Sequence, residues 1–251
     1  MPTRDKCAFC GERANLTAEH LWSAWAESLF GPRLYQYVRR EFESVTTWQK
    51  NKLDLKAKVV CAECNNRWMS ELESATKSVI KDMMLNCAET TLNARDLATI
   101  AAFGLTKAIV ADHMHTARPP ILTFAERQLF ARNLTFPRGV QMWLASMEVP
   151  HGVFKSRHAE TPSAVSRGFY FQAFTYGIGH FVIQVVICRF KKKSLRRHAN
   201  QPSLRQHLFW SSRSIAFWPH DGTSLRWPPS LHLSNELVDQ FVKRWTRLNL
   251  E

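Results

Sequence analysis

The chain has 251 residues, of which 45% are hydrophobic, and it includes nine tryptophans and sixteen phenylalanines. A chain of this length and composition can bury a large core, which excludes an intrinsically disordered protein and a mini-protein that depends on a metal for its whole fold. The 34 lysines and arginines against 21 acidic residues give a net charge of +13, which favours a polyanionic partner, with nucleic acid first and an anionic membrane surface second.

Cysteine usage and hydropathy together indicate a cytoplasmic protein. The amino terminus is polar and carries no hydrophobic signal, and the apolar run from Phe181 to Cys188 is interrupted by Gln184 and too short to span a bilayer. In a reducing compartment, cysteines spaced two residues apart are more often metal ligands than disulfides. We therefore expect a soluble chain with no membrane partner.

The first ninety residues predict a short helix, a group of strands and a longer helix, in that order. Apolar residues share one face from Leu21 to Phe30, where Gly31 ends the helix. Partial alternation from Tyr35 to Val60 predicts strands. From Asn65 apolar residues recur three or four apart, and Ser70-x-x-Glu73 is a candidate capping box within this helix.

The middle of the chain predicts two further helices, because two capping-box sequences each precede an apolar series. They are Asn93-x-x-Asp96 and Thr123-x-x-Glu126. Pro119 and Pro120 lie between them.

Beyond residue 140 the pattern changes to strands. Val140 to Val149 and Gly168 to Phe190 are dense in aromatic and β-branched residues, and Gly177-Ile178-Gly179 predicts a turn that divides the second run into two strands. Ser234 is the expected N-cap of a final helix. The fold class is therefore α+β, with a cysteine-bearing domain over residues 1–90 and a helical plus antiparallel β domain of unassigned role over residues 91–251.

Four of the six cysteines form two Cys-x-x-Cys pairs, Cys7 with Cys10 and Cys61 with Cys64. Two intervening residues allow a tight turn to direct both sulfurs at one Zn²⁺ ion, and four thiolates close a tetrahedral site. A catalytic zinc keeps one position open for water, so this pattern predicts a structural zinc.

The cysteine pairs frame three polar residues that could carry chemistry. Glu19 and His20 are adjacent, and Asn65 follows the second pair directly. Carboxylate and amide oxygens suit a hard divalent ion, and a neutral histidine can take a proton from water. The alternative is that Glu19 and His20 are ordinary surface residues and Asn65 caps a helix.

The assembled pattern resembles the zinc-knuckle branch of the HNH endonucleases over about residues 7 to 73. It comprises Cys7-x-x-Cys10-Gly11, Leu16-Thr17-Ala18-Glu19-His20 and Cys61-x-x-Cys64-Asn65-Asn66-x-Trp68-Met69. The resemblance implies a treble-clef-like ββα-metal fold and a DNA endonuclease. It further implies that His20 is the general base, that Glu19 and Asn65 hold Mg²⁺ or Mn²⁺, and that Arg67 lies near the scissile phosphate.

The sequence departs from the family in three ways. Glu19 replaces the more usual aspartate, the middle asparagine has no clean counterpart, with Asn51 and Lys56 as the nearest candidates, and the loop between the strands is long. A second hypothesis is therefore a zinc-stabilised module that binds DNA or RNA without cleaving it. Its basic residues would be those that surround the second cysteine pair in sequence: Arg39, Arg40, Lys50, Lys52, Lys56, Lys58 and Arg67.

Three further expectations complete the sequence-based picture. The lysines at 50, 52, 56 and 58 have even numbers and would share one face of a single strand. A different metal enzyme built on Asp112, His113 and His115 is a third, weaker hypothesis. Double-strand cutting by a one-metal site would favour a homodimer.

Overall fold

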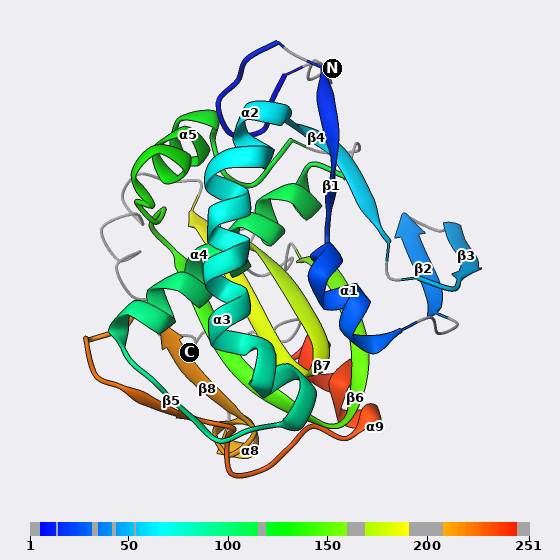
Figure 1. Cartoon of the computed structure of the whole chain (residues 1–251), viewed down its shortest axis with the longest axis vertical. Coiled ribbons are helices and arrows are strands. Elements are labelled where there is room, and N and C mark those ends of the chain that lie inside the picture. The colour runs from blue at the N-terminus through cyan, green and yellow to red at the C-terminus, as the bar shows by residue number, and fades with distance from the viewer. Residues whose placement is uncertain are drawn as a thin grey trace.

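The computed structural model describes residues 6–13, 15–31, 35–41, 44–52, 54–114, 119–159, 169–190 and 208–244. It combines helices and sheets, as the sequence predicts, and places the cysteine-bearing segment at one end of the molecule (Figure 1). Among the described helices, none has both the length and the apolar character that a membrane crossing requires.

The amino-terminal part is built on an antiparallel strand pair followed by helix. Strand β1 (Leu16–His20) pairs with β4 (Lys56–Cys61), and the chain continues directly into α2 (Ala62–Cys64), the π-helical segment η1 (Asn65–Met69) and α3 (Ser70–Asn86). Helix α1 (Ala24–Phe30) and the hairpin of β2 (Tyr35–Glu41) and β3 (Ser44–Lys50) lie between the paired strands in sequence.

Three helix starts test the capping predictions. Helix α4 (Ala94–Asp112) and helix α5 (Phe124–Asn133) both begin with complete capping boxes, so the predictions at Asn93 and Thr123 are confirmed. The prediction at Ser70 is wrong, because Ser70 follows η1 with helical backbone angles on both sides and has no free helix end to cap.

The carboxy-terminal part contains a sheet in the order β7-β6-β8. Its strands are β6 (Val140–Ala159), β7 (Phe169–Phe190) and β8 (Ser214–Trp218). The predicted turn at Gly177–Gly179 is wrong, because β6 extends far enough to pair with residues on both sides of these glycines. The register shifts there instead, between Ser146 and His151 on β6, opposite Phe181 and Gly179 on β7.

Short elements complete this part. Strand β5 (Thr90–Leu92) pairs with β9 (Leu225–Trp227), and α8 (Leu208–Ser211) precedes β8. Helix α9 (Asn235–Lys243) begins where predicted, with the Ser234 hydroxyl accepting a hydrogen bond from the Leu237 backbone N–H.

One hydrophobic core joins the two predicted domains. Buried residues of the cysteine turns, α3, α4 and the inner face of β7 belong to the same contact cluster. The Trp22 indole, just after β1, donates a hydrogen bond to the Gly177 carbonyl on β7 at 3.2 Å. The domain boundary near residue 90 remains a prediction. The segment that carries the candidate site packs against α4 and β7 in this shared core.

Candidate functional site

The four paired cysteines come together in one cluster. Their sulfur atoms all lie within 4.8 Å of one another, and among the described residues no other group of three or more cysteine, histidine or acidic side chains is arranged in this way. The cluster joins the turn before β1 to the end of β4: Cys7, Cys10, Cys61 and Cys64. Four converging thiols fit a closed, structural Zn²⁺ site, as the sequence predicts.

The first cysteine turn is held in shape by backbone and side-chain contacts. The Gly11 N–H donates to the Cys7 carbonyl at 3.1 Å, and the Ala8 N–H donates to Val59 of β4 at 2.8 Å. Gly11 has a φ of +78°, and a Cβ there would lie 2.4 Å from the ring of Phe124. Both the backbone conformation and the space require glycine at this position.

Hydrogen bonds among the thiols favour one ionised sulfur. The sulfurs of Cys10 and Cys61 are 3.6 Å apart, and the Cys64 N–H points to Cys61 Sγ at 3.5 Å. A hydrogen bond from the Cys64 thiol lowers the pKa of Cys7 and correspondingly raises the pKa of Cys64. A thiolate stabilised in this way is the form that binds metal.

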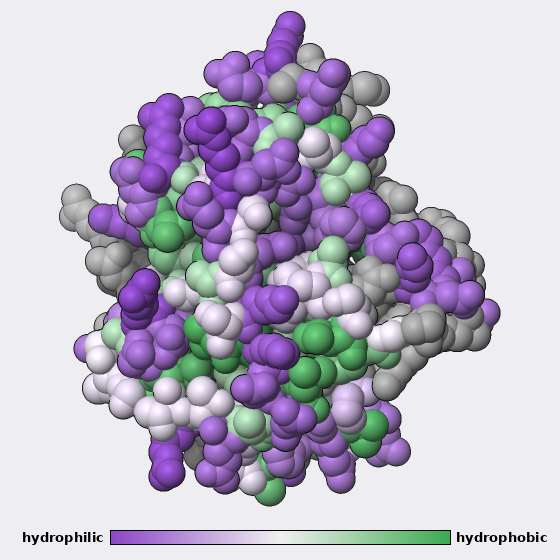
Figure 2. All heavy atoms as spheres, in the orientation of Figure 1, coloured by the Kyte–Doolittle hydropathy of each residue, from purple (hydrophilic) through white to green (hydrophobic). Residues whose placement is uncertain are grey.

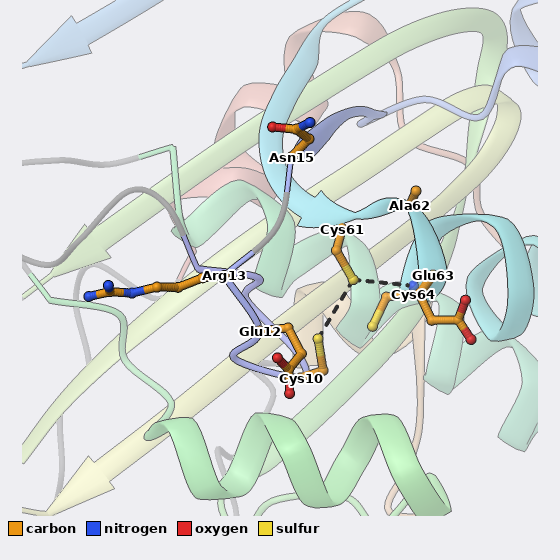
Figure 3. Close-up of a pocket in the computed structure, with 8 residues that line it drawn as sticks. All are labelled: Cys10, Glu12, Arg13, Asn15, Cys61, Ala62, Glu63 and Cys64. Carbon is orange, nitrogen blue, oxygen red and sulfur yellow. Dashed lines mark hydrogen bonds between the residues drawn. The ribbon is translucent and has the colours of Figure 1, made fainter.

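An open hollow of about 500 Å³ lies beside the cluster (Figure 3). Cys10 is the one partly exposed cysteine of the four and faces this hollow. The remaining lining residues come from the first cysteine turn and from the start of α2: Glu12, Arg13, Asn15, Cys61, Ala62, Glu63 and Cys64. A chelator could therefore reach the metal from this side.

Glu19 and His20 lie on opposite faces of the β1–β4 pair. Glu19 is opposite the buried Ala57 and is itself only 5% exposed, whereas His20 is opposite Lys56 and is partly exposed. Residues directly opposite one another in an antiparallel pair project to the same side. We call the side that carries Ala18, His20, Lys56 and Lys58 the outer face.

The carboxylate of Glu19 is engaged in a buried ion pair. Lys107 of α4, 2% exposed, places its ammonium 2.6 Å from Glu19 Oε1, 2.5 Å from Glu73 Oε1 of α3 and 2.7 Å from the His20 carbonyl oxygen. Ser23, at the start of α1, donates its hydroxyl to the same Glu73 oxygen at 2.7 Å. We call these four side chains, from Glu19, Ser23, Glu73 and Lys107, the buried cluster.

The ion implied by the HNH resemblance does not fit these residues. Glu19 already accepts from Lys107, and the Asn65 side chain donates its N–H to Thr17 Oγ1 at 3.0 Å. The Asn65 contact joins the beginning of η1 to β1, so the structure brings the three predicted catalytic residues onto neighbouring elements. In this arrangement the Glu19 carboxylate is occupied by the Lys107 ammonium, and the Asn65 amide is bound to the Thr17 hydroxyl.

The basic residues do not form one strand face. Strand β3 ends at Lys50, and a turn separates it from β4, so only Lys56 and Lys58 share a strand. The turn is closed by the ion pair of Lys50 with Asp54 at 2.6 Å. Lys52 is exposed in this turn.

Arg67, which the HNH resemblance places near a scissile phosphate, pairs with a neighbouring residue in the structure. Its Nε lies 2.9 Å from Glu63 Oε1, and both side chains are mostly exposed. Such an exposed pair is weak, so it leaves the guanidinium able to exchange partners. The side chains of Arg39 and Arg40 lie outside the described residues.

Asp112 and His113, two of the three residues of the third hypothesis, form hydrogen bonds at the end of α4. Asp112 Oδ2 accepts the Ile121 N–H at 2.7 Å, and His113 Nδ1 lies 2.8 Å from the Ile109 carbonyl oxygen. Both residues thus close the end of α4, and His115 lies outside the described residues.

Sequence reasoning missed Lys107 and its partners Glu73 and Ser23. The signal was present, because Lys107 is the one charged residue within an otherwise apolar helical series from Leu97 to Ala111. A charge on the buried stripe of a helix needs an opposite charge nearby. The sequence does not show which acidic residue supplies it, since Glu19 is 88 positions away.

No family model, curated protein or solved structure matches the chain. The resemblance to the HNH endonucleases therefore depends on its motif residues and on the order of elements around them.

Proposed function

We propose that the chain is a nucleic-acid-binding protein whose outer face, organised by a structural zinc site, contacts the phosphate backbone. The observation that carries this proposal is the split of β1 and β4 into a buried side held by Lys107 and an outer face with Lys56 and Lys58 beside His20. Phosphate contacts by lysine supply most sequence-independent affinity for nucleic acid.

The order of elements supports the proposal. An antiparallel pair followed by a helix, with a zinc site at the junction, is the arrangement of the ββα-metal modules that the motif residues resemble. The net charge of +13 adds a long-range attraction for a polyanion.

We expect the Lys56→Gln, Lys58→Gln double variant to bind a labelled duplex more weakly and with less salt dependence. Each lost phosphate contact reduces the slope of log K against log salt by roughly 0.9, so the pair should reduce it by about 1.8. Fluorescence anisotropy over a salt series measures this slope. Lys81→Gln, which removes an exposed charge from α3, is the matched control. A slope unchanged in the double variant would exclude the outer face as the contact surface.

A second candidate function is phosphodiester hydrolysis, the activity that the HNH resemblance implies. One observation favours it: His20 is partly exposed on the outer face, and burial together with the nearby charge of Lys56 lowers its pKa. The imidazole is therefore neutral at pH 7 and could accept a proton from water at a bound phosphate.

Under this second candidate, supercoiled plasmid should be nicked by the wild type and not by His20→Ala. Because the base must be neutral, the rate should be constant above pH 7 and fall about tenfold per pH unit below the lowered pKa of His20. Agarose gels in Mg²⁺, Mn²⁺ and EDTA measure nicking, with zinc content and duplex binding of the variant as controls. If the wild type binds the duplex but does not nick the plasmid under any of these conditions, hydrolysis is excluded and the binding function is the one that stands.

A further inference from the structure

The buried cluster has the composition of a hard-cation site, with an ammonium at its centre. Three oxygen atoms surround Lys107 Nζ at 2.5 to 2.7 Å: two carboxylate oxygens and one backbone carbonyl oxygen. Carboxylate and carbonyl oxygens are also the ligands that Mg²⁺ and Ca²⁺ take in proteins. These oxygens come from β1 and α3, and the ammonium comes from α4.

The hydrogen bonding of the ammonium is complete. A protonated lysine has three N–H donors, and the three oxygens match them one to one. Glu73 Oε1 also accepts from the Ser23 hydroxyl, so a carboxylate oxygen that a metal would need is shared between two donors. All three N–H donors of Lys107 are therefore used within the protein, and none needs a water molecule as its partner.

Charge and burial keep Lys107 in place. Burial alone would favour the neutral amine, but the charges of Glu19 and Glu73 outweigh burial and raise the pKa of Lys107. The side chain emerges from a part of α4 in which every residue from Ile100 to Asp112 is buried, and its Nζ lies 5.5 Å from the centre of the Phe103 ring. The side chains of Lys107 and Glu19 are buried, whereas that of Glu73 is 26% exposed. For a divalent ion to reach the Glu19 carboxylate, the ammonium would have to leave this packed environment.

We propose that Lys107 is the permanent cation of this site and stands in place of the divalent ion that the HNH resemblance implies at Glu19. The carboxylate of Glu19 is then a structural partner of Lys107, and His20 is held through its carbonyl oxygen by the same ammonium. The proposal concerns cation occupancy alone, and it holds whether or not the chain binds nucleic acid.

The test titrates Mn²⁺ alone into the zinc-loaded full chain and measures free Mn²⁺ by electron paramagnetic resonance. Wild type and the control Lys81→Ala should retain no Mn²⁺ at this site. Lys107→Ala, which leaves two carboxylates without their cation, should bind one Mn²⁺ at least about tenfold more tightly than wild type. Adding Glu19→Gln to Lys107→Ala should remove the gain.

Two results would overturn the proposal. One is a single Mn²⁺ bound by wild type and lost in Glu19→Gln, because the metal would then have displaced the lysine. The other is a folded Lys107→Ala variant that gains no Mn²⁺ affinity.

If Lys107→Ala does not fold, reductive methylation of the wild type followed by mass spectrometry decides the question. Lys107 should stay unmodified with and without Mn²⁺ while exposed Lys81 reacts, whereas methylation of Lys107 that appears on addition of Mn²⁺ would show that the ion replaces it.

Discussion

Removal of zinc is expected to unfold the cysteine turns together with β1 and β4. Structural zinc contributes roughly 10–16 kcal/mol of apparent binding free energy in small zinc modules, which is as large as the total stability of a typical domain, about 5–15 kcal/mol. Cys61→Ser should have nearly the same effect, because Cys61 is 4% exposed and close to the sulfur of Cys10. Zinc content per chain and thermal unfolding followed by circular dichroism measure both consequences.

The matched control for Cys61→Ser is Cys87→Ser. Cys87 is partly buried and lies outside the metal cluster, so its variant should keep one zinc per chain and change stability by about 1 kcal/mol or less. Two results would contradict a structural zinc site. One is wild-type protein that contains no zinc even when it is produced with zinc in the medium, and the other is a Cys61→Ser variant that unfolds at the same temperature as the wild type. The hollow beside Cys10 should let a chelator extract the ion from the folded chain.

Replacement of Lys107 by methionine is expected to lower the free energy of unfolding by about 3–5 kcal/mol, because it leaves the buried Glu19 carboxylate without a positive partner. Methionine keeps most of the side-chain volume, so the loss reports on charge more than on packing. Urea denaturation followed by tryptophan fluorescence measures it.

Neutralising the partners should restore much of this stability. Adding Glu19→Gln and Glu73→Gln to Lys107→Met removes the uncompensated charge, and we expect the triple variant to be more stable than Lys107→Met alone. Lys81→Met, at an exposed position of α3, should be within about 0.5 kcal/mol of wild type. A Lys107→Met variant as stable as wild type would show that the ion pair contributes little.

Features that depend on neighbouring residues were predicted from sequence, and features that depend on distant pairing were not. The capping boxes at Asn93 and Thr123 involve residues three positions apart and appear in the structure as predicted. The turn at Gly177–Gly179 failed because glycine favours both turns and bulges, and the length of β6 decides between them.

The candidate site likewise has a part that the sequence predicted and a part that it did not. The cysteine spacing correctly predicted that the four thiols come together, since two tight pairs are the usual ligand pattern of one tetrahedral metal site. The assignment of Glu19 as a metal ligand could not anticipate Lys107, because the two residues meet through the packing of α4 beneath β1. Strand β1 places Glu19 and His20 on opposite sides, so Glu19 is buried and His20 is partly exposed.

The β2–β3 hairpin lies between the two cysteine pairs in sequence and projects from the side of the molecule (Figure 1). Hydrophilic and hydrophobic side chains are mixed on the face of the molecule that carries α3 (Figure 2). Cys10 and Cys61 are 51 positions apart, and their sulfurs lie 3.6 Å from one another, so a metal ion bound by the four cysteines would hold the two ends of this long segment together.

A segment whose two ends are held together can change in length or sequence without disturbing the strands to which it is attached. Doubling the length of a closed loop costs only about 0.6 kcal/mol, so shorter, longer or foreign segments could replace the hairpin while β1 and β4 stay paired. In the laboratory the hairpin therefore offers an insertion point for a reporter or an affinity tag.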